Sequence, residues 1–129
     1  MSLESALFTL ITTNAPVAAV MGTRLYPDVI PQDQAMPAGH YRTVTNRPAT
    51  AHSGAAGVEF STVRFSIFAP LRADAITLRE LIKPVVNGYK GTAGGETLDA
   101  VFYREGVNTF DVESGLYAAQ FDLIVTRRV

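Results

Sequence analysis

Two long segments in which apolar and polar residues alternate constrain the fold of this chain more than any other feature. They span Val58–Ala69 and Leu116–Arg127. Alternation with a period of two is typical of β-strands that bury one face. The apolar residues that share one face of each segment are Val63, Phe65, Ile67 and Ala69 in the first and Tyr117, Ala119, Phe121, Leu123 and Val125 in the second. The pattern predicts a central strand and a final strand that supply the two halves of one core.

Three further segments are expected to form helices. Apolar residues recur every three or four positions over about 2–13 and about 71–87, which places them on one helix face. We expect Ser2 to cap the first of these helices. Asn14 stands before Ala15-Pro16, a typical helix start, so a short helix is expected over 15–21. Pro84 has no backbone N–H, and we expect it to kink or end the last helix.

The remaining segments predict shorter strands and loops. Leu25 and Tyr26 indicate a short strand, and His40–Thr45 alternates weakly, as a strand near a sheet edge does. The segment 89–104 is typical of a hairpin that turns at Gly94-Gly95. Residues Asn46–Gly57 are rich in Pro, Ala, Ser and Gly and have no period. They predict a long mobile loop, and loops of that length are usually functional or disordered.

These elements define the expected fold class. Helices and strands do not alternate regularly, as they would in a chain of βαβ units. We therefore expect an α+β fold in which residues 1–129 form a single domain. Its sheet is antiparallel or mixed, with the helices packed mainly on one face.

Composition excludes several classes of function. The chain of 129 residues has 11 basic and 12 acidic residues, a net charge of −1 and no cysteine. A net charge this close to zero provides no basic surface for binding duplex DNA. The absence of cysteine excludes thiolate zinc sites and cysteine nucleophiles. The longest apolar stretches are far shorter than a membrane-spanning helix requires, so no membrane partner is expected.

The candidate chemical groups favour structural interpretations. His40 and His52 have no nearby set of metal ligands, and a metal site needs three or four of them. The glycines at 91, 94 and 95 lead into a strand, whereas a phosphate loop opens a helix. The carboxylates of Glu105, Asp111 and Glu113 do not have the spacing of a calcium loop. We therefore assign no catalytic, cofactor-binding or metal-binding residue and expect no cofactor.

The order of several motifs resembles the phage tail completion family, which is also described as tail-to-head joining proteins. An N-terminal amphipathic helix precedes Pro-Val-Ala-Ala-Val-Met-Gly-Thr-Arg-Leu-Tyr-Pro at 16–27. The motifs Gly-Tyr-Lys-Gly-Thr-Ala-Gly-Gly at 88–95 and Asp-Val-Glu-Ser-Gly-Leu-Tyr at 111–117 follow the alternating strand and the long helix. Each motif is weak by itself, but together they cover essentially the whole chain.

The resemblance implies a structural virion protein of a tailed bacteriophage or prophage, assembled in the cytoplasm of the bacterial host. Such a subunit is not an enzyme and forms a homo-hexameric ring between the tail tube and the head connector or neck proteins. DNA is then only cargo that passes through the channel. We expect contacts to neighbours from Asn46, Arg47 and His52 of the loop, and from the three carboxylates Glu105, Asp111 and Glu113. The alternative is a small non-viral binding or regulatory module that acts as a monomer or dimer.

Overall fold

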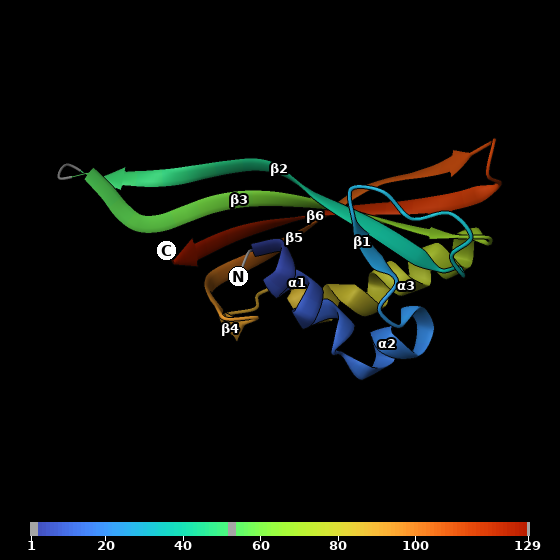
Figure 1. The fold of residues 1–129 in the computed structure, drawn as a ribbon, viewed down its shortest axis with the longest axis horizontal. Helices are drawn as coiled ribbons and strands as arrows, with labels where there is room; N and C mark the ends of the chain where they lie inside the picture. The colour runs from blue at the N-terminus through green and yellow to red at the C-terminus, as the bar shows by residue number, and fades with distance from the viewer. Residues whose placement is uncertain (1–2, 52–53, 129) are drawn as a thin grey trace.

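The computed structural model describes residues 3–51 and 54–128 (Figure 1). The elements in chain order are α1 (Leu3–Thr12), α2 (Ala15–Met21), β1 (Leu25–Pro27), β2 (Ala38–Ala51), β3 (Gly54–Ala69), α3 (Arg72–Val86), β4 (Gly91–Ala93), β5 (Glu96–Asp111) and β6 (Leu116–Arg128). Ser2, the expected cap of α1, lies outside the described residues.

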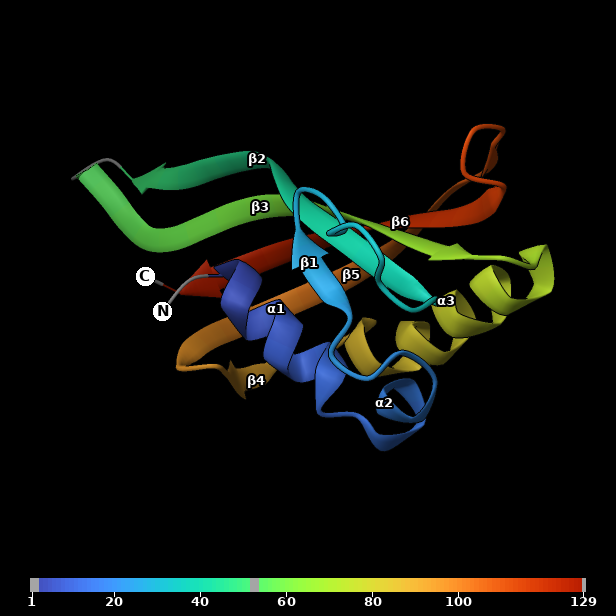
Figure 2. The ribbon, with the colours of Figure 1, turned by 45° about the vertical axis from the view of Figure 1, so that its right-hand side comes forward.

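One six-stranded sheet organises the chain. Its strand order is β1-β2-β3-β6-β5-β4, with β1 parallel to β2 and every other pair antiparallel. The helices gather on one face of this sheet, as Figure 2 shows. The predicted α+β class with a mixed sheet is therefore confirmed. The two alternating segments that led to this prediction, β3 and β6, lie side by side in the centre.

The core lies between the sheet and the helices. Phe65 of β3 stands opposite Phe121 of β6, and their rings stack with centroids 5.0 Å apart. Tyr103 of β5 stacks on the other side of Phe121 at 5.2 Å. The helices bury against these rings the apolar side chains Leu3, Leu7 and Ile11 of α1, Val17 and Met21 of α2, and Leu78, Ile82 and Val86 of α3. The predicted inward faces of both central strands are confirmed, because their alternate residues from Val63 and from Ala119 are fully buried.

The helix ends follow from local chemistry. The Oδ1 atom of Asn14 accepts a hydrogen bond from the backbone N–H of Val17, as expected for the cap of α2. Gly22, with φ 61°, follows the last residue of that helix. Pro84 does not end α3, which continues to Val86. A proline two residues from a helix end removes only one hydrogen bond in the last turn, where the chain soon leaves the helix anyway.

Among the described residues, no single helix is long and apolar enough to cross a membrane. Helices α1 and α2 together reach the necessary length and composition, but they are bent by 91° at the break between them. Both helices bury apolar side chains in the core against the sheet.

The prediction of a loop over 46–57 is wrong for the residues that the structure describes there. Strand β2 continues to Ala51 and β3 begins at Gly54, and the two remain paired up to Ala51 and Gly54. Strands pair through backbone groups, so pairing needs no alternation of apolar and polar residues. The segment lacks this alternation, and for that reason its sequence predicted a loop. We call 46–51 of β2 and 54–60 of β3 the arm. Strand β6 pairs with β3 only from Val58 onward, so the end of the arm is two-stranded and projects from the sheet (Figure 1).

A second projection, the distal hairpin, forms at the opposite end of the sheet. Strand β5 continues past Arg104, where the sequence predicted its end, to Asp111, and β6 begins at Leu116. We define the distal hairpin as residues 105–116. The register of β5 against β6 shifts between Glu105 and Asn108, which marks a β-bulge at its base.

Gly94 provides a test of how α1 packs on the sheet. Its φ is 54°, and an added Cβ would lie 2.8 Å from the backbone Cα of Ala6 in α1. We expect Gly94→Ala to destabilise the protein by about 2–4 kcal/mol, the sum of left-handed strain and a steric clash. Gly115 has φ 70° but open space around its Cβ position, so Gly115→Ala should cost only the strain, about 1–2 kcal/mol. Equal losses in urea unfolding would contradict the close approach of α1.

Candidate interaction surface

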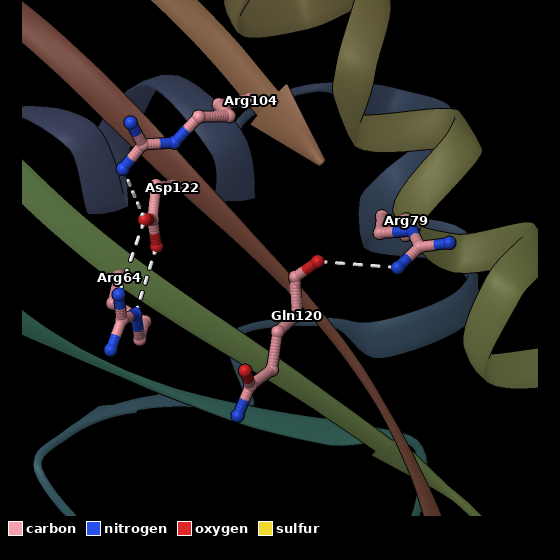
Figure 3. A network of polar contacts seen from close by, with 5 residues as sticks. All are labelled: Arg64, Arg79, Arg104, Gln120 and Asp122. Carbon is pink, nitrogen blue, oxygen red and sulfur yellow. Dashed lines mark hydrogen bonds and ion pairs between the residues drawn. The ribbon is translucent and has the colours of Figure 1, made fainter. Parts of the chain in front are cut away.

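The sheet face opposite the helices, which we call the open face, carries a row of charged side chains. Arg42, Arg64, Asp122 and Arg104 stand opposite one another on β2, β3, β6 and β5, in that order. Figure 3 shows Arg64 and Arg104 on either side of Asp122, whose carboxylate they share. Strands far apart in the sequence bring the row together, so only the register of the sheet reveals it.

Asp122 is the only carboxylate in this row. Its Oδ1 accepts from the Nε of Arg64 at 3.0 Å, and its Oδ2 accepts from Arg104 at 2.9 Å. The side chain of Asp122 is 9% exposed, against 40% for Arg64 and 61% for Arg104. Burial alone would raise the pKa of Asp122, but the hydrogen bonds from Arg64 and Arg104 outweigh it and hold this pKa below its usual value. The row keeps an excess of positive charge, since Arg42 stands beside Arg64 without adding a carboxylate.

The lowered pKa of Asp122 predicts an acid-dependent contribution to stability. A carboxylate with a depressed folded-state pKa stabilises the fold above its unfolded pKa, near 3.8, and loses this effect as pH falls through the folded value. We expect Asp122→Asn to lower the free energy of unfolding by about 1 kcal/mol at neutral pH, since the arginines are largely solvated. The difference from the wild-type protein should shrink below about pH 4 in urea unfolding. A difference that is constant with pH would contradict this assignment.

On the helix side of the sheet, Arg79 of α3 connects to the bulge of the distal hairpin. Arg79 is only 3% exposed. One terminal nitrogen donates to Oδ1 of Asn108 at 2.6 Å and to the backbone oxygen of Gln120 at 3.2 Å (Figure 3 shows the second bond). The other lies 3.6 Å from a carboxylate oxygen of Glu105. A buried guanidinium with these partners fixes the base of the hairpin to α3.

The arm carries a basic side chain at its base. The guanidinium of Arg47 lies 5.6 Å from the centre of the Phe60 ring, within range of a cation–π interaction. Oδ1 of Asn46 accepts a hydrogen bond from Ser61 at 2.7 Å. Glu59, next to Phe60, is ion-paired with Arg127, and the hydrogen bond from Arg127 lowers the pKa of Glu59. Arg47 and Phe60 both lie on the open face, in register with one another.

The distal hairpin carries acidic and apolar side chains. The carboxylate of Asp111 accepts from the backbone N–H of Glu113 at 3.2 Å and from the hydroxyl of Ser114 at 2.8 Å, which shapes the turn. Glu113 is exposed. Two valines of the hairpin are also exposed, Val112 by 83% and Val107 by 61%. Apolar side chains exposed together on a short projection are typical of a surface that meets another protein.

The residues that were expected from the sequence to contact neighbours fall into two groups in the structure. Asn46 and Arg47 lie at the base of the arm, whereas Glu105, Asp111 and Glu113 belong to the distal hairpin at the other end of the sheet. His52 lies outside the described residues. His40 belongs to β2, and burial, followed by the charge of Arg42, lowers its pKa. Its ring lies 5.4 Å from Phe68, and no group of metal ligands occurs among the residues that the structure describes.

The chain folds like a virion protein. A chain in the virion of a native gene transfer agent (GTA) particle superposes with a TM-score of 0.82 over 99% of this chain and 96% of that chain. Its sequence is only 15% identical, so the likeness establishes the fold. No curated protein matches this chain.

The sequence itself establishes the family. Residues 5–126 match the family of the tail completion protein gp17, so this chain belongs to that family. The match covers all three helices and all six strands almost completely. The chain is therefore a structural protein of a phage tail, and the resemblance found in the motifs is confirmed.

Proposed function

We propose that this protein forms a closed ring of identical subunits where the tail of a tailed phage meets the head. The match of residues 5–126 to the tail completion family is the observation that carries this proposal. A ring at this place completes the tail tube and offers a second face to the connector or neck proteins of the head. DNA passes through its channel as cargo, and the subunit needs neither a cofactor nor a catalytic residue for this role.

The shape of the subunit supports a ring. Cyclic assembly requires two different patches on each subunit, because each copy contacts one neighbour on either side. The arm and the distal hairpin are two such patches at opposite ends of the sheet (Figure 1). A homo-hexamer is the stoichiometry that the family resemblance implies, and we adopt it here.

The test is to produce particles without this gene and to examine them by negative-stain electron microscopy. We expect filled heads and separate tails, with joining restored when the gene is supplied from a plasmid. Intact, infectious particles in the absence of the gene would overturn the proposed role. They would mean that this tail protein is not needed to join heads to tails.

A further inference from the structure

We propose that neighbouring copies of this chain join by strand addition. The outer edge of β2 near the arm of one copy pairs with the outer edge of β5 near the distal hairpin of the next. This inference rests on the proposed ring and specifies its subunit contact. The occupant of each edge is thus a second copy of this chain.

The outer edge of β2 is covered only near its start. Strand β1 pairs with Gly39–Tyr41 there. The carboxylate of Glu4 then accepts from the backbone N–H of Thr43 at 3.0 Å and from its hydroxyl at 2.8 Å. From Val44 to Ala51, no strand within the described chain pairs on this side. Uncovered edges of this kind expose backbone groups that can pair with another chain.

The outer edge of β5 is covered in the same way at its start. Strand β4 pairs with Glu96–Leu98, the oxygen of Val101 accepts from the N–H of Gly88 at 2.8 Å, and the N–H of Tyr103 donates to Asn87 at 3.2 Å. Between Arg104 and Asp111, no described strand pairs on this side. The two uncovered edges, Val44–Ala51 and Arg104–Asp111, are equal in length.

The directions of the strands suit such a contact. Strands β2 and β5 run in opposite directions within the subunit, because three antiparallel pairings separate them in the sheet. A neighbour generated by rotation about an axis to which the strands are moderately tilted keeps nearly the same strand directions, and the tilt offsets the two copies along the strands. Its β2 therefore meets β5 of the first copy in an antiparallel arrangement, the more stable pairing per residue.

The uncovered edges lie at opposite ends of the sheet, so the neighbour must be displaced along the strands. Val44 then lies near Asp111, and Ala51 lies near Arg104 of the adjacent copy. This displacement corresponds to the stagger that tilted strands need when a sheet closes on itself. Without the displacement, β4 of one copy would face the uncovered edge of β2 in the other, and β1 would face the uncovered edge of β5.

Charge favours this register. Arg47 projects from the open face, as its register with Phe60 requires, and Asp111 and Thr109 lie on that face through their pairing with Leu116 and Ala118. In the displaced arrangement Arg47 of one copy comes within diagonal reach of Asp111 of the next, a separation at which long side chains interact. Arg47 of the arm and the acidic distal hairpin are thus complementary, and this complementarity specifies the neighbour and the register.

The experiment uses the absence of native cysteine in the chain. Val44 and Val112, which are 43% and 83% exposed, are both changed to Cys, and particles that contain this variant are treated with a flexible bis-maleimide. We expect a ladder of covalent oligomers that ends at the size of the complete ring, whereas each single-cysteine variant gives none. Joined particles without a ladder would overturn the strand contact while leaving the proposed function intact.

Charge reversal tests the register. In the double-cysteine background, Arg47→Glu should reduce the yield of covalent oligomers about tenfold, because the introduced carboxylate then faces Asp111 of the neighbour. Adding Thr109→Lys, which gives this carboxylate a partner, should restore the ladder. Lys90→Glu makes the same change of charge at an exposed position just before β4 and should leave the yield of covalent oligomers unchanged. An undiminished ladder with Arg47→Glu, or no recovery with Thr109→Lys, would contradict the proposed pairing.

Discussion

Phe121→Ala is expected to lower the free energy of unfolding by about 4 kcal/mol. The ring of Phe121 is fully buried between those of Phe65 and Tyr103, at centroid distances of 5.0 and 5.2 Å. Its removal leaves a cavity that rigid strands on both sides cannot fill. The loss should appear in urea unfolding as a lower midpoint with an unchanged slope.

Phe102→Ala is the matched control for this variant. Phe102 occupies the neighbouring strand β5 but lies on the open face and is 60% exposed. The same truncation there should change the free energy of unfolding by no more than about 0.5 kcal/mol. Similar losses in the two variants would mean that the helices do not cover the face that carries Phe121.

Arg79→Ala is expected to cost about 3 kcal/mol and to loosen the distal hairpin. The substitution removes a guanidinium that is 3% exposed and leaves Asn108 and the backbone oxygen of Gln120 without their donor. Unpaired buried acceptors are costly, and the bulge of β5 would lose its tie to α3. Hydrogen exchange should become faster in 105–111, and urea unfolding should report the change in stability.

Arg104→Ala is the control for Arg79→Ala. Arg104 is the same residue type one position before the bulge, but its side chain is 61% exposed and donates to Asp122 on the open face. We expect a loss of no more than about 1 kcal/mol and unchanged exchange in the hairpin. Faster hairpin exchange in Arg104→Ala than in Arg79→Ala would contradict the role of Arg79.

Most of the fold could be predicted from local patterns because its core depends on them. The alternation in β3 and β6 and the helical spacing in α1 and α3 each bury one face, so the period of the apolar residues determines the element. The hairpin turn is another local signal, since Gly94 and Gly95 have φ values of 54° and 82°. These elements account for the core and for the layer of helices on one face.

The arm could not be predicted in this way. Asn46–Gly57 has no apolar period, because its strands are held by pairing with each other and project beyond β6. An apolar period in a strand indicates that one face is buried against the helices. The two-stranded extension has no face buried in this way, so its sequence shows no such period. The segment was nevertheless selected for contacts to neighbours, and Arg47 keeps that role in the proposed strand contact.

The open face was also missed, for a different reason. A net charge of −1 suggested a surface without strong charge. The sheet instead collects Arg42, Arg64 and Arg104 in one row around Asp122. The members of the row are up to 80 positions apart in the sequence numbering, and only the strand order and register bring them together. Overall charge says little about how the charges are distributed over a surface.

Electron cryomicroscopy of the particle's head–tail junction tests whether this subunit acts through surfaces presented to its own copies. We expect a closed ring of copies of this fold at the head-proximal end of the tail, with β2 of each copy beside β5 of the next. Density for this fold as isolated, non-touching copies, or a junction that lacks the protein, would contradict it.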